Sequence, residues 1–182
     1  ADAGAKTLFV LRDSNKDGVA EERFVFSDKL DQPFGIAFYK DWVYVANTSS
    51  VVRFKYKPGQ TKAEGEPEKL IELTRGGYNQ HWTRNILFSP DGKKLYFVSK
   101  RPLNGKSKDD FDIWMTEKIN GVWSEPKHLG NEVNTKMDEF YPSVAANGNL
   151  YFTASYNESV SKEDIFLARF ENGNYTKPVV LD

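Results

Sequence analysis

The sequence predicts an all-β fold, specifically a β-propeller of about three and a half to four four-stranded antiparallel blades. Helical periodicity is nearly absent, and short alternating apolar runs bounded by Gly, Pro, Asn and Asp recur along the 182 residues. Strands centred on Tyr44, Tyr96 and Tyr151 repeat at intervals of about fifty residues, and each repeat ends in a strand that follows a proline. A four-stranded unit that repeats every ~40–50 residues is typical of a propeller blade.

A β-sandwich is the alternative fold, because it would also contain many short strands. It gives no reason, however, for strand order, turn type and a proline-led fourth strand to repeat three times. Each propeller blade buries both faces against its neighbours, which explains why the predicted strands are apolar on both sides.

The predicted strands follow one another in a regular order. Two strands, Thr7–Leu11 and Arg23–Phe26, flank a polar run at residues 13–18. Residues rich in Val, Ile and aromatics, which favour strands, then fall into three groups of four. The first group is Phe34–Phe38, Trp42–Val45, Val51–Tyr56 and Lys69–Leu73. The second is Asn85–Phe88, Leu95–Val98, Phe111–Met115 and Pro126–Leu129, and the third is Pro142–Ala145, Leu150–Thr153, Asp164–Ala168 and Pro178–Leu181.

The blade count bears on the assembled state. Closed propellers use about four to eight blades, so three and a half blades leave apolar blade faces open. The chain is therefore a fragment, a tight four-bladed variant, or one subunit of a ring completed by oligomerisation. Two copies would supply about seven blades, and we expect self-association through the open faces.

Composition excludes several classes of function. The 25 basic and 26 acidic residues are interspersed, so no basic stripe indicates nucleic acid as a partner. The absence of cysteine excludes disulfides and thiolate chemistry. No apolar run approaches the ~20 residues of a membrane span, and residues 1–5 carry no signal-peptide pattern.

The first half resembles the soluble quinoprotein glucose and sorbosone dehydrogenases, over residues ~8–97. The motifs that carry this resemblance are Leu11-Arg12-Asp13, Pro33-Phe34-Gly35-Ile36-Ala37-Phe38, Tyr44-Val45-Ala46-Asn47, Gly65-Glu66-Pro67 and Gly77-Tyr78-Asn79-Gln80-His81-Trp82-Thr83-Arg84. The resemblance implies a propeller fold and sugar oxidation with pyrroloquinoline quinone and calcium as cofactors.

The second half, residues ~89–182, looks instead like the TolB-type propeller repeats. Its motifs are Ser89-Pro90-Asp91-Gly92-Lys93-Lys94-Leu95-Tyr96-Phe97, Asp112-Ile113-Trp114, Gly121-Val122-Trp123-Ser124-Glu125-Pro126 and Asp138-Glu139-Phe140-Tyr141-Pro142. We therefore interpret the chain as a hybrid propeller, natural or engineered, with dehydrogenase-like blades in residues 1–88 and TolB-like blades in 89–182. Both resemblances imply a periplasmic or secreted location, or a cytoplasmic one if the chain is made recombinantly.

His81 is the main catalytic candidate. It lies between the fourth strand of one blade and the first strand of the next. The dehydrogenase resemblance implies that it acts as general base on a sugar hydroxyl while hydride passes to the quinone, a role that suits the pKa of histidine. Gln80 and Arg84 would orient substrate or quinone oxygens. The alternative is a loop histidine that has lost its catalytic partners.

The polar run at 13–18 has the spacing of a calcium loop. Asp13, Asn15 and Asp17 offer oxygens at the first, third and fifth positions, with Gly18 at the sixth. Phe24 stands at the twelfth position, where a bidentate Glu belongs, and Glu21 or Glu22 could replace it only along another backbone path. A polar turn between two strands would explain the same residues.

Other polar residues are interpreted as structural. We expect the Asp138-Glu139 pair and Lys108-Asp109-Asp110 to be solvated turns, Asp112 to bind backbone N–H groups in its turn, and His128 to have no ligand partner.

The sequence thus favours a structural or binding propeller module without a complete catalytic site and with no cofactor. Its connecting loops would bind a small polar ligand or a protein. The alternative is a quinoprotein sugar oxidoreductase that uses His81, Arg84 and Gln80 with pyrroloquinoline quinone and calcium.

Overall fold

The computed structural model describes residues 1–73, 85–156, 159 and 163–181. Within this part of the chain every regular element is a strand, and the sheets are antiparallel, which confirms the predicted all-β propeller fold. The chain divides into two compact units, Ala1–Leu73 and Thr74–Asp182. No helix of the described residues is long and apolar enough to cross a membrane.

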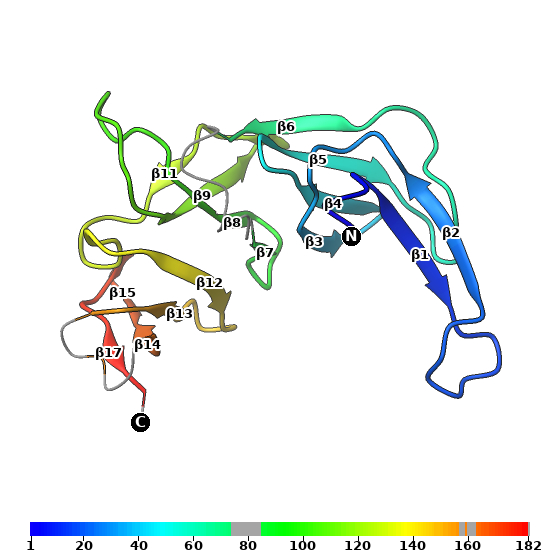
Figure 1. The fold of residues 1–182 in the computed structure, drawn as a ribbon. Coiled ribbons are helices and arrows are strands. Elements are labelled where there is room, and N and C mark those ends of the chain that lie inside the picture. Colours follow the sequence, from blue (N-terminus) through cyan, green and yellow to red (C-terminus); the bar gives the residue numbers. More distant parts are fainter. Residues whose placement is uncertain (74–84, 157–158, 160–162, 182) are drawn as a thin grey trace. The chain divides into compact units, whose positions relative to one another are not determined.

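Unit 1 contains one two-stranded sheet and one complete blade (Figure 1). The two-stranded sheet pairs β1 (Leu8–Arg12) with β2 (Glu22–Ser27). The blade has the order β3-β4-β5-β6, with bounds β3 (Gly35–Tyr39), β4 (Trp42–Ala46), β5 (Ser50–Lys55) and β6 (Glu68–Glu72). Its core joins the two sheets, since Leu8 and Phe26 pack with Val43, Val45 and Phe54.

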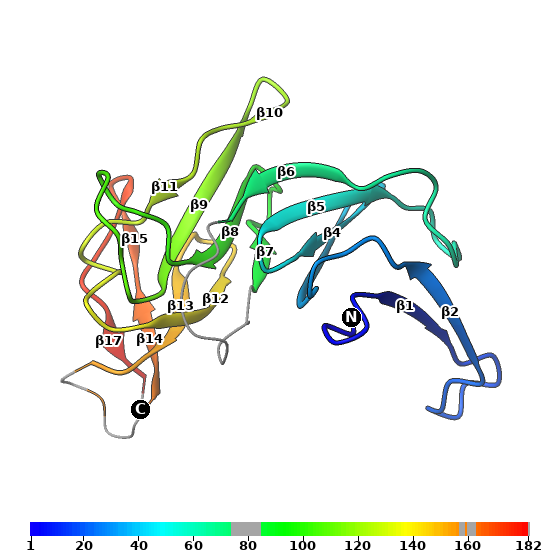
Figure 2. The ribbon, with the colours of Figure 1, turned by 45° about the horizontal axis from the view of Figure 1, so that its top comes forward.

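Unit 2 contains two blades. The first consists of β7 (Ile86–Phe88), β8 (Lys94–Ser99), β9 (Asp112–Ile119), β10 (Val122–Trp123) and β11 (Lys127–His128). The second consists of β12 (Glu139–Val144), β13 (Leu150–Ala154), β14 (Asp164–Ala168) and β17 (Val179–Val180). Figure 2 shows β12 beside β8, and the first strand of the second blade packs against β7, β8 and β9.

Two short hairpins in unit 2 go beyond the predicted strands. The long strand β9 continues past its pairing with β11 and pairs with β10, and β15 (Phe170–Glu171) pairs with β16 (Asn174–Tyr175). Both hairpins turn at Asn-Gly pairs with positive φ, at residues 120–121 and 172–173. Asn-Gly with left-handed φ at both positions is the preferred two-residue hairpin turn, so this signal was present in the sequence.

Strand β12 begins three residues before the predicted Pro142, at Glu139. Its pairing with β13 shifts register between Phe140 and Ser143, and Tyr141 has a φ of 49°. Proline cannot donate to a ladder and is tolerated in a strand at an edge or a bulge. The proline therefore marks an irregularity inside the strand and not its start.

Candidate functional site

The three residues predicted for catalysis, Gln80, His81 and Arg84, lie outside the described residues. They belong to the connection between β6 and β7. Their role therefore stays a prediction.

The predicted calcium loop lies between β1 and β2. The Asp13 carboxylate accepts hydrogen bonds from the backbone N–H of Lys16 (2.6 Å), Asp17 (3.2 Å) and Gly18 (2.8 Å). Carboxylate oxygens of Asp13, Asp17 and Glu21 lie within 4.8 Å of one another. The loop therefore places Glu21 beside Asp13 and Asp17, two of the predicted calcium ligands. The side-chain amide of Asn15, the third predicted ligand, donates a hydrogen bond to the Asp17 carboxylate at 3.1 Å.

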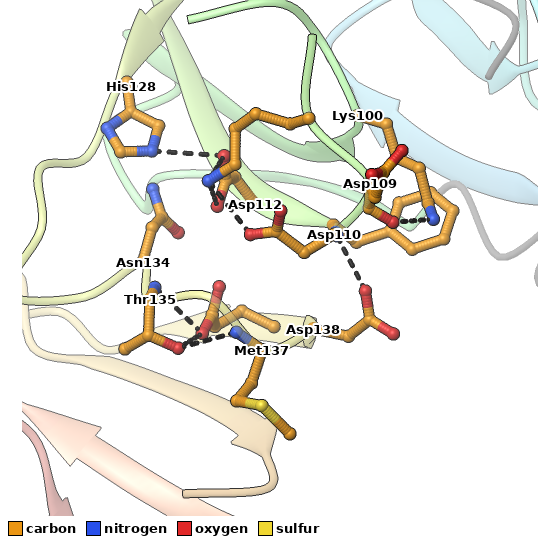
Figure 3. A network of polar contacts seen from close by, with 12 residues as sticks. Lys100, Asp109, Asp110, Asp112, His128, Asn134, Thr135, Met137 and Asp138 are labelled. Carbon is orange, nitrogen blue, oxygen red and sulfur yellow. Dashed lines mark hydrogen bonds and ion pairs between the residues drawn. The ribbon is translucent and has the colours of Figure 1, made fainter. Parts of the chain in front are cut away.

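A second polar cluster, which sequence reasoning missed, joins the two blades of unit 2 (Figure 3). We call it the junction network. Its members are Lys108, Asp110, Asp112, His128, Asn134, Thr135, Asp138 and Glu139. It lies where β8 connects to β9 and where β11 connects to β12. Because β8 and β11 both run antiparallel to β9, the two connections lie at the same end of the blade.

Asp112 is the centre of the junction network. Its side chain is 0% exposed, and its two carboxylate oxygens lie 2.7 and 2.6 Å from Lys108 Nζ. Lys108 Nζ also lies 3.0 Å from an oxygen of Asp110. Burial by itself lowers the pKa of Lys108, but the hydrogen bonds to Asp112 and Asp110 outweigh it and raise that pKa above its ordinary value. Lys108 is therefore a charged lysine held between two carboxylates.

His128 closes the other side of this carboxylate. Its Nε2 lies 3.2 Å from the Asp112 carboxylate, and its Nδ1 accepts a hydrogen bond from Gly130 N–H at 3.2 Å. The ring packs edge-on against Trp114 with centroids 5.1 Å apart. Because the ring is largely buried and each of its nitrogens faces a protein group, His128 is positioned as a structural histidine.

The network also binds backbone groups in place of a strand partner. Asn134 accepts from Ile113 N–H at 2.8 Å and donates to Ile113 C=O at 3.0 Å, so its amide pairs with β9 as a neighbouring strand would. The Asp138 carboxylate accepts from Phe111 N–H at 2.7 Å, and Glu139 N–H donates to Phe111 C=O at 2.8 Å. These bonds fix the connection between the two blades.

Glu139 is the most perturbed acid of the network. It is 0% exposed, and one oxygen accepts from Thr135 N–H (3.1 Å) and from the Thr135 hydroxyl (2.8 Å). Burial raises the pKa of Glu139 to about 8, against the lowering effect of Thr135 and Tyr156, and the negative charge of Asp112 adds to the rise. Glu139 is therefore mostly protonated at neutral pH.

The structure corrects three expectations from the sequence. Glu139 is buried and is not a solvated turn residue, and Lys108 and Asp110 form a largely buried ion pair instead of a solvated turn. The partners of the buried Asp112 carboxylate are the side chains of Lys108 and His128. The missed signal is positional, because Asp112, Trp114 and Thr116 alternate along β9 and share one buried face. A carboxylate inside an apolar strand pattern needs a partner, and Asp112 has one from its own connection, Lys108, and one from the later strand β11, His128.

A pocket of about 240 Å³ opens beside the network. It is lined by Asp109, Asp110, Lys136, Met137 and Asp138. Three carboxylates against one ammonium make it acidic. A polyanionic quinone needs convergent cationic donors, so these described residues do not fit pyrroloquinoline quinone.

The comparison with solved structures finds matches at low sequence identity. A candidate 6-phosphogluconolactonase from Bacteroides uniformis matches with a TM-score of 0.50 and 19% identity, over 94% of this chain and 49% of that one. The tricorn protease matches with a TM-score of 0.49 and 18% identity, over 80% of this chain and 13% of that one. A glucose dehydrogenase gives a TM-score of 0.45 and 12% identity, over 78% and 45%. The chain thus spans about half the length of the first of these structures.

The comparison with curated proteins gives no match. A family model described as a domain of unknown function, DUF7133, matches residues 3–174 without a break at the boundary between the units. On that match over nearly the whole length, the chain belongs to the DUF7133 family.

Proposed function

We propose that the chain is a structural and binding module of a β-propeller, without a complete catalytic site of its own. The observation that carries this proposal is the internal pairing of the junction network. Lys108 is held by Asp112 and Asp110, and His128 by Asp112 and Gly130. Such mutual pairing stabilises the junction between the two blades and engages both the lysine and the histidine of the network with protein groups.

The acidic pocket beside the network supplies the binding part of the proposal. Asp109, Asp110 and Asp138 line it with one lysine, Lys136. Its charge favours a positively charged group, either on a small polar ligand or on a protein side chain.

A reconstitution assay tests the proposal. The purified chain, incubated with pyrroloquinoline quinone and calcium, is expected to give no aldose-dependent reduction of a redox dye, since one histidine and one arginine do not supply the many convergent donors that a polyanionic quinone needs. The competing function is a quinoprotein sugar oxidoreductase with His81 as base and Arg84 and Gln80 as orienting groups. Dye reduction that disappears in His81→Ala, while His128→Ala keeps it, would establish that competing function.

We further propose that the β1–β2 loop binds calcium through Asp13, Asn15, Asp17 and Glu21. The proposal is supported by the convergence of three carboxylates within 4.8 Å. Calcium is expected to raise the melting temperature of the chain at millimolar concentrations, because it binds only the folded loop, and magnesium is expected to have little effect. Asp17→Asn should abolish the rise. The exposed Asp28 is not in the loop, so Asp28→Asn should preserve it; an equal rise in both variants would contradict the site.

The two resemblances found in the sequence lead to a proposal about origin. We propose that dehydrogenase-like and TolB-like blades were joined near residues 90–92 in the ancestry of the family, with a periplasmic or secreted protein as the setting. The Asn-Gly hairpins support it, since among the described blades both in unit 2 carry one and the blade of unit 1 carries none. Family members whose second half lacks these hairpins would argue against the proposal.

A further inference from the structure

Unit 1 begins with a sheet of two strands where a blade has four. Strand β1 pairs with β2, and within the described residues it has no strand partner on its other edge. In the order of the chain, β1 and β2 occupy the positions of the third and fourth strands of a blade, since β3 starts the next one. The first and second strands of that blade are missing beside β1.

Unit 2 provides the internal comparison. There the preceding blade is complete, and β12 packs against its β7, β8 and β9. Phe140 of β12 is buried in the shared core, together with Tyr96 and Val98 of β8. In unit 2, the first strand of the second blade is thus covered by the first three strands of the blade before it.

The corresponding strand of unit 1, β3, is not covered in this way. Ile36 is 37% exposed and Phe38 is 61% exposed, and they lie opposite Val45 and Val43 on one face of the blade. A groove of about 270 Å³ runs between this face and β1, lined among others by Leu8, Leu11, Ile36, Phe38 and Val43. The apolar groove and the open edge of β1 are therefore adjacent.

We propose that this groove and edge form the docking site for a β-hairpin, which pairs with β1 and lays an apolar face over β3 and β4. The occupant is the first strand pair of a propeller blade. It comes from the part of the ring that this sequence does not contain, because the chain spans only 49% of the length of its structural match. A free strand edge provides the main-chain hydrogen bonds, and the groove selects alternate apolar side chains.

A second copy of the chain fits this site poorly. Its last blade already pairs β14 with its own fourth strand β17, and its β1–β2 sheet repeats the third and fourth strand positions. No unpaired first and second strands are available in the described part of a copy. The inference does not depend on the proposed function, because the groove is lined by none of the residues of the junction network, the acidic pocket or the β1–β2 loop.

A fusion protein tests the inference without relying on the weak folding of an isolated hairpin. An extra copy of residues 85–99, which form the β7–β8 strand pair, is joined to Ala1 of the full chain through a Gly/Ser linker of about eight residues. Some backbone amides among Phe9, Val10 and Leu11 point away from β2 and have no hydrogen bond to it. In the fusion, these amides are expected to exchange their hydrogen with solvent about tenfold more slowly than in the unmodified chain.

Three variants of the fusion define the result. Replacing Leu87, Tyr96 and Val98 by Ser in the added copy only, or Phe38→Asp in the groove, should remove the protection. Val122→Asp should keep it, since Val122 is 71% exposed and lies in unit 2. Unchanged exchange in the fusion, or equal protection in all variants, would overturn the inference. Protection of the unmodified chain that grows with concentration, alongside a dimer mass, would overturn it in favour of a second copy.

Discussion

Glu139→Gln is expected to remove a large pH dependence of stability from this protein. The pKa of Glu139 is raised from 4.5 to about 8 by burial in the folded chain. Between these two values the unfolded chain releases the proton and the folded chain keeps it. The free energy of unfolding of the wild type should therefore fall by about 1.4 kcal/mol for each pH unit as pH rises from 4.5 to 8.

Glutamine keeps the shape and the acceptor of the native side chain. Its carbonyl oxygen can accept the same two bonds from Thr135, but it has no proton to lose. Glu139→Gln should therefore be more stable than the wild type at pH 8 and should lack the slope that Glu139 contributes. The raised pKa of Glu139 changes the free energy of unfolding at pH values above 4.5. The pKa values of Asp41, Glu68, Glu72 and Asp91 are lowered instead, so these groups change it at pH values below their ordinary pKa range.

Urea unfolding followed by circular dichroism at pH 5, 6 and 7.5 measures the effect. The difference in stability between Glu139→Gln and the wild type should change by about 3 kcal/mol across this range. Glu132→Gln is the matched control, because Glu132 is exposed in the same connection. This variant should keep the wild-type slope of unfolding free energy against pH. A slope that persists in Glu139→Gln would show that Glu139 is not the titrating group.

Lys108→Met is expected to cost about 3–5 kcal/mol of unfolding free energy at pH 7. The substitution preserves much of the side-chain volume and removes the charge that both Asp112 and Asp110 contact. Asp112 would then be a fully buried carboxyl group without its cation. Removal of one partner of a buried ion pair destabilises a protein strongly, because the other charge is left buried and uncompensated.

Two further variants separate this cause from a general loss of packing. Lys106 is exposed in the same connection, so Lys106→Met should change stability by no more than about 0.5 kcal/mol. The double variant Lys108→Met with Asp112→Asn should recover most of the loss, because the amide is neutral and still offers an oxygen to His128. A double variant as unstable as Lys108→Met alone would contradict the role of the unpaired carboxylate.

Local sequence patterns are sufficient to predict the strands and their grouping. Alternating apolar residues, Asn-Gly and Asp-Gly turns and the fifty-residue repeat are local features, and they place every strand of the four-stranded groups to within a few residues. The sequence also indicated the half blade, since Thr7–Leu11 and Arg23–Phe26 had no partners within their own group. The prediction of a calcium loop also rests on a local pattern, the spacing of Asp13, Asn15 and Asp17.

Which polar residues are buried together depends on the packing of the blades, and no local pattern in the sequence predicts it. Asp112 and His128 are sixteen positions apart, and Glu139 is twenty-seven from Asp112. They meet because β11 pairs with β9 and because β12 packs against the preceding blade. The pKa of Glu139 and the uncovered face of β3 have the same origin, since both depend on what a neighbouring blade covers, and a local sequence pattern does not contain that information.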